Sequence, residues 1–265
     1  MISPFCVLTI AGSDSGGGAG IQADQRTIRA LGGHALTAVT AITAQDTERI
    51  TVWAPVPDEL IGAQIASAFG GFRVAAAKTG LLASPGAVRA VASALAGGPA
   101  IPLVVDPVLA SSSGTVFLPP AGVRALKQHL FTRATLVTPN WAEAQALAAI
   151  TVRTHAKAAD AGRRIADACG RPVLVKGGHA PRGACRDCLV LPGGKVSWFT
   201  HRRIATGNTH GTGCVLSSAI AAWLGRGASL EDAIRLSQSF LMRGLERGRG
   251  LGWGRGRGPA YFGSR

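Results

Sequence analysis

The sequence contains no apolar run near the roughly 20 residues that a helix needs to cross a bilayer. Its N-terminus, Met1-Ile2-Ser3-Pro4, lacks the basic region of a secretory signal. Cysteine is also scarce, and five cysteines, an odd number, do not suit the disulfide framework of a secreted protein. We therefore expect a cytoplasmic protein that does not enter a membrane.

A complete zinc motif is missing as well. Cys185 and Cys188 form a CxxC pair, but no second pair and no nearby pair of histidines supplies the remaining ligands of a zinc site. We interpret the pair as incidental.

Acidic residues are few. Lysine and arginine total 28 against 14 aspartates and glutamates, which gives a formal net charge of +14. Such a surface attracts molecules that carry phosphate, either nucleotides or nucleic acids. The basic residues cluster clearly only in a Gly- and Arg-rich tail at about residues 247–265. Nucleic-acid binding is the weaker alternative, because such tails bind single strands best with aromatic stacking and only Trp253, Tyr261 and Phe262 can supply it.

The first glycine-rich loop excludes two common nucleotide-binding folds. Phe5–Ile10 reads as a buried strand, and Gly12–Gly20 leads from it into a helix. Strand, glycine loop and helix form a ligand-binding unit. No Lys-Ser or Lys-Thr follows the glycines, and the G-x-G-x-x-G spacing is absent, so the loop is neither a P-loop nor a dinucleotide fingerprint.

The remaining chain alternates expected strands with expected helices. With 265 residues and 47% hydrophobic content, residues 1–265 can bury a core as a single domain. The alternation predicts an α/β fold with a mainly parallel sheet that is covered on both faces. The expected strands are Leu36–Thr43, Val74–Ala77, Leu103–Val105, Thr135–Thr138 and Val173–Val175, with a hairpin of Cys188–Leu191 and Val196–Thr200. The expected helices are Asp58–Phe69, Pro85–Leu95, 121–130, one opening at Asn140, 156–169, one after Cys214, and 230–245.

Polar residues recur where these strands end. They are Asp14, Gln45, Thr79, Asp106, Asn140 with Glu143, Lys176 and the stretch Asn208–Cys214. Any one of them can be a cap or a turn residue. Because ligands of parallel sheets bind at the carboxyl ends of the strands, their common position predicts a shared cleft.

The stretch Asn208–Cys214 is the centre of this cleft. Gly211 and Gly213 allow close approach of a ligand, and the free N–H groups of a helix start favour an anion. A thiol at this position, Cys214, is expected to favour its thiolate and to act as a base or nucleophile. The alternative is a tight turn capped by Thr209 or Thr212, with Cys214 in the core.

An anion site, a lysine, two carboxylates and a glycine loop together suggest phosphoryl transfer. Asp106 and Glu143 can organise Mg²⁺, which prefers oxygen ligands and keeps several waters. Lys176 can hold a nucleotide phosphate.

Six motifs, in order from about residue 5 to 245, resemble the hydroxymethylpyrimidine/phosphomethylpyrimidine kinases, the thiamine-biosynthesis branch of the ribokinase superfamily. They are Gly12–Asp24, Thr40–Gln45, Asp106-Pro107-Val108, Thr138-Pro139-Asn140 with Glu143, Val175–His179 and Asn208–Cys214. The resemblance implies a three-layer α/β/α ribokinase-like fold, use of ATP and Mg²⁺, and a homodimer. It also implies phosphorylation of 4-amino-5-hydroxymethyl-2-methylpyrimidine and then of its monophosphate.

The resemblance also assigns roles to residues. Catalysis falls to Cys214 with Gly211, Thr212 and Gly213; substrate binding to Gln45, Asp24, Gly12, Ala19 and Val108; nucleotide binding to Lys176, Asn140 and Thr209; and metal binding to Asp106 and Glu143. A carboxamide such as Gln45 can accept from the pyrimidine amino group while donating to the ring nitrogen.

Three positions depart from the family pattern: Asp46, Leu81 and Gly207. Asp46 and Leu81 lie near the expected pyrimidine pocket, so a pyridoxal or pyridoxine kinase of the same superfamily is the alternative function.

Overall fold

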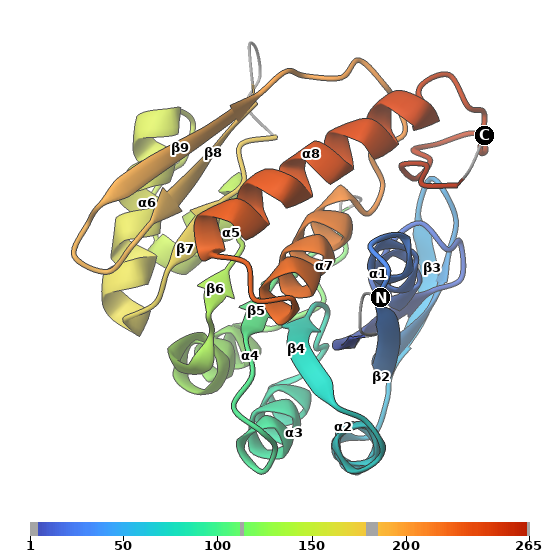
Figure 1. The fold of residues 1–265 in the computed structure, drawn as a ribbon, viewed down its shortest axis with the longest axis vertical. Helices are drawn as coiled ribbons and strands as arrows, with labels where there is room; N and C mark the ends of the chain where they lie inside the picture. Colours follow the sequence, from blue (N-terminus) through green and yellow to red (C-terminus); the bar gives the residue numbers. More distant parts are fainter. Residues whose placement is uncertain (1–4, 112–113, 179–184, 264–265) are drawn as a thin grey trace.

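The computed structural model describes residues 5–111, 114–178 and 185–263. In this part of the chain one nine-stranded sheet has the order β3-β2-β1-β4-β5-β6-β7-β8-β9 (Figure 1). Its parallel strands are β1 (Cys6–Asp14), β2 (His34–Gln45), β4 (Val74–Thr79), β5 (Leu103–Val105), β6 (Leu136–Val137) and β7 (Val173–Val175). Antiparallel strands complete the edges: β3 (Ile50–Pro55) at one, and β8 (Cys185–Val190) with β9 (Val196–His201) at the other.

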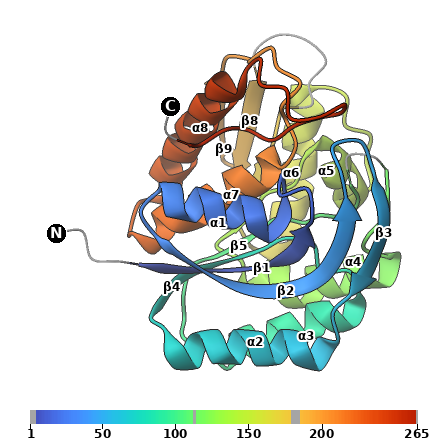
Figure 2. The same ribbon diagram turned by 90° about the vertical axis from the view of Figure 1, so that its right-hand side faces the viewer.

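Helices cover both faces of the sheet, which confirms the predicted three-layer α/β/α fold. On one face lie α2 (Asp58–Gly71), α3 (Pro85–Ala96), α4 (Pro120–Ala125), α5 (Trp141–Ala148) and α6 (His155–Cys169). On the other lie α1 (Gly20–Ala30), α7 (Thr212–Gly225) and α8 (Leu230–Gly248). Figure 2 shows the sheet edge-on between α2 and α3 below and α1, α7 and α8 above.

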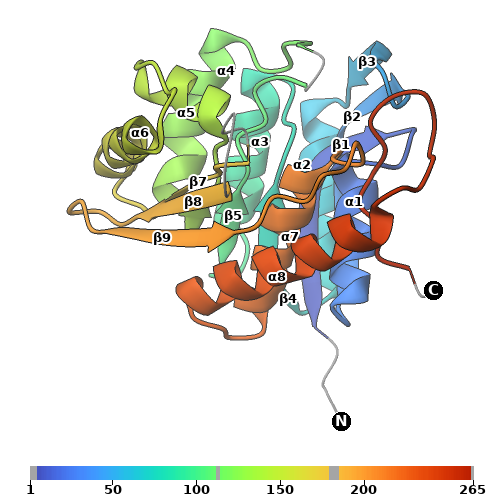
Figure 3. The ribbon, with the colours of Figure 1, turned by 90° about the horizontal axis from the view of Figure 1, so that it is seen from above.

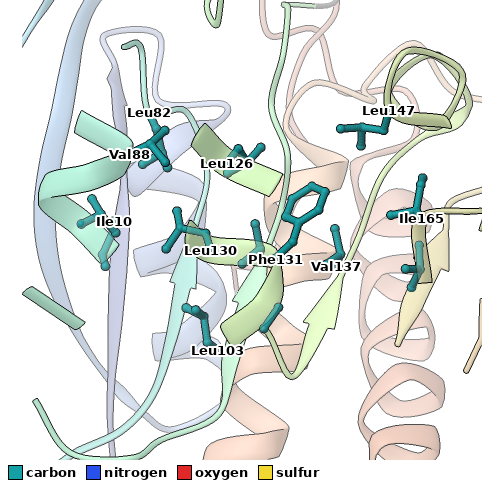
Figure 4. Close-up of a cluster of buried hydrophobic side chains, with 14 of the residues drawn as sticks. Ile10, Leu82, Val88, Leu103, Leu126, Leu130, Phe131, Val137, Leu147 and Ile165 are labelled. Atoms are coloured by element: carbon teal, nitrogen blue, oxygen red, sulfur yellow. The ribbon is translucent and has the colours of Figure 1, made fainter. Parts of the chain in front are cut away.

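Strict alternation along the central strands fills two separate cores. Successive side chains of a strand point to opposite faces, so each apolar strand contributes to both. Leu8, Ala77, Val105, Val137 and Val175 pack under α2 to α6, and their neighbours Val7, Ala76, Val104, Leu136 and Leu174 pack under α1, α7 and α8. Figure 4 shows part of the first core, including Val137, Leu130 and Phe131. Because both faces of these strands are buried, they occur in the sequence as short continuous apolar runs and not as alternating apolar and polar residues.

The bounds of several elements differ from expectation, and the clearest differences are the following. Strand β1 continues past Ile10 to Asp14, with a register shift against β2, and so places Asp14 at the carboxyl ends of the strands. The helix expected at 121–130 breaks after Ala125 into a π-helical turn, Leu126–Leu130, and a short 3₁₀ turn, Phe131–Arg133. Strand β3 was not predicted.

The Gly- and Arg-rich tail follows α8 and runs along the body of the protein. Its backbone reaches the turn between β2 and β3, where Gly256 N and Arg257 N donate to Thr47 Oγ1 (3.0 Å) and Thr47 O (2.8 Å). A Cβ on Gly256 would lie only 2.1 Å from Thr47 O, so this position requires glycine. Figure 3 shows the tail beside α1 and the ends of β1 and β2.

No helix among residues 5–111, 114–178 and 185–263 has the length and apolar character needed to cross a membrane.

Candidate active site

The carboxylate of Asp14 joins the two glycine motifs. It accepts hydrogen bonds from the N–H groups of Gly16 (2.8 Å), Gly18 (3.0 Å) and Ala19 (2.8 Å), and it lies 2.9 Å from Nε2 of His210. Burial acts to raise the pKa of Asp14, but the bonds from His210 and Ala19 outweigh it and lower that pKa. The loop before α1 and the stretch before α7 are therefore held together by one charged group.

Helix α7 begins without a side-chain cap. Its N-cap is Gly211, in the left-handed region at φ 74°, and no side chain in the described part of the chain caps the helix. A Cβ on Gly211 would lie 2.0 Å from Gly18 O, so the backbones meet closely here. The alternative in which Thr209 or Thr212 caps this turn is wrong. The first-turn N–H groups, which include those of Gly213 and Cys214, are placed to receive an anion.

Cys214 is half-buried at this helix start, but its thiol is not acidic. Burial raises the pKa of Cys214 to about 11; the carboxylates of Asp24 and Asp106 add to the increase, and Lys78 opposes it. The expectation that the helix start favours the thiolate is therefore wrong for the ligand-free protein. Burial and the two carboxylates outweigh the lowering effects of Lys78 and of the Gly20 backbone.

Asp106 and Lys176, which follow β5 and β7, form a largely buried ion pair. Lys176 Nζ lies 2.7 Å from Asp106 Oδ1, and Thr138 Oγ1 and Ser217 Oγ donate to the same carboxylate at 3.1 and 3.2 Å. Burial acts to raise the pKa of Asp106, but Lys176 lowers it below its usual value. Lys176 Nζ also lies 3.3 Å from the position of a Cβ on Gly213, so it borders the anion site of α7.

Asn140 and Glu143 form a capping box at the start of α5. Asn140 Oδ1 accepts from Glu143 N at 3.0 Å, and Glu143 Oε2 accepts from Asn140 N at 2.7 Å. Burial raises the pKa of Glu143 to about 7, and Asp106 adds to this effect against Lys176. The two predicted metal ligands are thus within electrostatic reach of one another.

Asp24, predicted to contact substrate, is instead fully buried. Its carboxylate lies 2.9 Å from Lys78 Nζ and accepts from Thr9 Oγ1 at 2.5 Å, and neither side chain of the ion pair is exposed. Burial acts to lower the pKa of Lys78, but the charge of Asp24 outweighs it and raises that pKa. Sequence reasoning missed Lys78, although a lone lysine directly after the apolar strand Val74–Ala77 was a visible signal.

Gln45 borders a cavity at the end of β2. The cavity has a volume of about 280 Å³ and is lined by Gln45, Asp46, Thr47, Glu48, Arg49, His210, Gly256 and Arg257. The Gln45 amide nitrogen lies 3.1 Å from His210 Nε2. Asp46 Oδ1 accepts from the N–H groups of Glu48 (2.7 Å) and Arg49 (2.8 Å), so Asp46 shapes the turn of this wall.

An apolar cluster forms next to the glycine loop. Ala41, Leu81, Ala83 and Phe117 are buried together, with Val108 half-buried against them. A Cβ on Gly12 would lie 2.7 Å from Leu81 Cδ2, so Gly12 packs directly on Leu81. The structure thereby brings together the predicted substrate residues Gly12 and Val108 with Leu81.

Two predicted cleft residues serve other contacts. The Asn208 side chain donates to Gly248 O at 2.7 Å and Leu251 O at 2.8 Å, and so anchors the tail. Thr79 is fully buried, and its backbone oxygen accepts from Asp106 N at 3.0 Å. His179, the last residue of the Lys176 motif, lies outside the described residues.

The sequence matches the model of one protein family, phosphomethylpyrimidine kinase, over residues 14–261. The chain belongs to this family. A hydroxymethylpyrimidine/phosphomethylpyrimidine kinase of Mycobacterium bovis is 42% identical over 262 residues, which cover 97% of this chain and 94% of that protein. A thiamine biosynthesis bifunctional protein of Geobacter sulfurreducens is 39% identical over 253 residues, or 96% of this chain; the match spans 51% of that longer protein.

Solved structures of two kinds of kinase resemble the fold of this family member. A phosphomethylpyrimidine kinase of Clostridium difficile has a TM-score of 0.77 and 34% identity, covering 90% of this chain and 98% of its own. A pyridoxal kinase of Bacillus subtilis, described as an ADP complex, has a TM-score of 0.87 and 30% identity, with 97% and 98% coverage.

The buried Lys78–Asp24 pair predicts a large difference between single and double substitution. Lys78→Met leaves an uncompensated buried carboxylate and should lower the free energy of unfolding by about 3–5 kcal/mol. Asp24→Asn/Lys78→Met removes both charges and should recover most of that loss. Urea unfolding followed by circular dichroism measures both values. A double variant as unstable as Lys78→Met would show that the lost charge pair is not the cause.

The raised pKa predicts slow alkylation of Cys214. In the folded, ligand-free protein its reaction rate with iodoacetamide should be low at pH 7 and should keep rising through pH 10, because the thiolate fraction rises toward a pKa of about 11. Mass spectrometry of the peptide containing Cys214 gives the rate. The same cysteine in urea, with an ordinary thiol pKa of about 8.5, is the control. A folded-state rate that levels off near pH 7 would contradict the raised pKa.

Proposed function

We propose that the protein uses ATP to phosphorylate 4-amino-5-hydroxymethyl-2-methylpyrimidine and then its monophosphate, two steps of thiamine diphosphate biosynthesis. One observation carries the proposal. The uncapped start of α7, with Cys214 inside it, borders the Asp106–Lys176 pair, and it is tied through Asp14 and His210 to the cavity at Gln45. The start of α7, which suits the transferred phosphoryl group, therefore lies next to the cavity at Gln45, which suits the polar pyrimidine ring.

The residues divide the work of phosphoryl transfer. Lys176 neutralises a nucleotide phosphate, with Asn140 and Thr209 on the same side. The N–H groups of Gly211, Thr212 and Gly213 stabilise the transferred group, whose charge spreads over its equatorial oxygens. The thiolate form of Cys214 accepts the proton of the substrate hydroxyl as that oxygen bonds to the γ-phosphorus of ATP and the bond from this phosphorus to ADP breaks. The monophosphate is tolerated as a second acceptor because the same helix start stabilises an anion.

The residues present fit Mg²⁺. This ion is usually held by one or two carboxylates together with phosphates and water. Asp106 and Glu143 are two such carboxylates, and within the described ranges no group of three or more His, Cys, Asp or Glu side chains forms an all-protein metal site. Mg²⁺ held by Asp106 and Glu143 would neutralise charge on the phosphates of ATP.

Asp24 takes an indirect role in this proposal. With no exposed surface, it holds Lys78 beneath Cys214 rather than binding the pyrimidine. Gln45, Gly12, Ala19 and Val108 remain the proposed substrate contacts. A homodimer, a single domain over residues 1–265 and a cytoplasmic location remain predictions.

The orientation of Gln45 follows from its neighbours. The ionised Asp14 accepts a hydrogen bond, so His210 carries its proton on Nε2. Two donors cannot bond to each other, so we infer that the Gln45 carboxamide is turned by half a rotation, which brings its oxygen instead of its nitrogen toward His210 Nε2 to share the N–H with Asp14. That oxygen retains a second lone pair for the pyrimidine amino group, and the amide N–H is free of His210 and can donate to the ring nitrogen.

Pyridoxal phosphorylation is the second candidate, favoured by the close likeness to the B. subtilis pyridoxal kinase. A pyridoxal-type substrate has a phenolic oxygen in place of the amino and ring-nitrogen pair, and so leaves Gln45 without its two matched partners.

Substrate preference is tested by ATP consumption with the pyrimidine, its monophosphate, pyridoxal, pyridoxine and ribose. We expect the pyrimidine and its monophosphate to be preferred. Gln45→Ala should reduce kcat/KM for the pyrimidine by about 5- to 150-fold, the cost of losing a buried hydrogen-bond partner, and should affect pyridoxal less. Equal or better turnover of pyridoxal would assign the protein to the vitamin B6 kinases. No turnover of any substrate would favour the binding-protein alternative, for which a salt-dependent shift of an oligonucleotide is the assay.

Cys214→Ala should lower turnover about 10²- to 10⁴-fold, the usual range for a positioned acid–base group. If Cys214 is the base, the wild-type turnover should also rise with pH above 7, because burial raises the pKa of the thiol and the thiolate fraction is small at neutral pH. This rise should be absent from the residual activity of Cys214→Ala. A variant with near wild-type turnover would exclude Cys214 as the base.

A further inference from the structure

A buried carboxylate outside the predicted site joins three elements of the fold. Asp187 lies in β8 and is 3% exposed. Its Oδ1 accepts from Gly177 N at 2.6 Å, in the loop after β7, and its Oδ2 accepts from Gln238 Nε2 at 2.6 Å, on α8. His201 Nε2 of β9 lies 3.7 Å from the same Oδ2. A buried carboxylate requires such partners, so these contacts fix the loop relative to the sheet and the helix.

The loop bonded to Asp187 carries Lys176. Lys176 N donates to Pro139 O at 2.8 Å, and the next N–H, that of Gly177, donates to Asp187. The two successive backbone N–H groups of Lys176 and Gly177 are thus bonded to two different parts of the fold. A Cβ on Gly177 would lie 1.9 Å from Arg186 O, which shows how closely the loop packs on β8.

We propose that Asp187 is a positioning residue for Lys176: by fixing the N–H of Gly177 it sets where Lys176 Nζ meets the nucleotide phosphate. This inference rests on the proposed function of Lys176 as the phosphate ligand. The position that Asp187 maintains is the one in which Nζ reaches both Asp106, at 2.7 Å, and the border of the α7 anion site at Gly213. A lysine is a point charge on a flexible stem, so its aim depends on how firmly its backbone is held.

A purely structural role for Asp187 makes a different prediction. In that case its important contact is with Gln238, which ties α8 to the sheet. Gln238→Ala removes this tie and leaves the bond from Gly177 N to Asp187 in place, so it is the matched control.

The experiment measures ADP affinity by calorimetry and, separately, KM for ATP and for the pyrimidine. Asp187→Ala should weaken ADP binding and raise KM for ATP about tenfold, within the 5- to 150-fold range of a lost buried hydrogen bond, with little change in KM for the pyrimidine. Asp187→Asn keeps an oxygen for Gly177 N and should restore binding to within about threefold. Gln238→Ala should bind ADP as the wild type does.

If Asp187→Ala does not fold, Asp187→Leu/Gln238→Leu replaces both partners by apolar groups of similar size and still leaves Gly177 N without its acceptor. It should show the same loss of ADP affinity. Wild-type ADP affinity in either variant, or an equal loss in Gln238→Ala, would overturn the positioning role. Wild-type protein that binds ADP but phosphorylates no pyrimidine, with affinity still lost in Asp187→Ala, would refute the proposed substrate and leave the positioning role intact. A wild type that binds no ADP would refute both.

Discussion

The site depends on one carboxylate. Asp14 is the last residue of β1, at the carboxyl ends of the strands. There it accepts hydrogen bonds from three backbone N–H groups of its own loop and from the imidazole of His210. The two glycine motifs are separated by most of the chain, yet they can approach because neither places a side chain at the contact between Gly18 and Gly211. His210 Nε2 also lies 3.1 Å from the side-chain amide of Gln45, so the contacts of Asp14 extend to Gln45. The glycine loop before α1, the stretch before α7 and Gln45 are therefore linked through Asp14 and His210.

Two buried ion pairs lie near the Asp14 network. Lys78 is paired with Asp24 and Lys176 with Asp106, and both pairs lie where water has little access. Such pairs are a weak source of stability, since desolvation offsets their attraction, but each becomes costly when one partner is lost. Their effect on Cys214 is also unequal, because burial and the carboxylates raise the pKa of the thiol more than Lys78 lowers it. The excess positive charge of the chain is carried elsewhere, on its surface.

The contacts of the Gly- and Arg-rich tail explain part of its unusual composition. Gly254, Gly256 and Gly258 lie against Thr47 and Asn208, where an added Cβ would clash, and the intervening Arg255 and Arg257 are exposed. A Cβ on Gly250 or Gly252 would instead face open space. Packing therefore explains these three glycines of the Gly- and Arg-rich tail, and the same segment places Arg257 on the wall of the cavity at Gln45.

The sequence by itself determined the layers, the parallel strands and the position of Gln45, Asp106 and Lys176 at the carboxyl ends of their strands. It did so because apolar runs mark buried strands, and because parallel strands with helical crossovers bring their carboxyl ends to one edge. Tertiary structure decided that Asp24 is buried against Lys78, that Asn208 anchors the tail, that burial raises the pKa of the Cys214 thiol, and that Asp187 bonds to the loop of Lys176. These properties depend on desolvation and on contacts between segments far apart in the chain, and neither is encoded in the local pattern of residues.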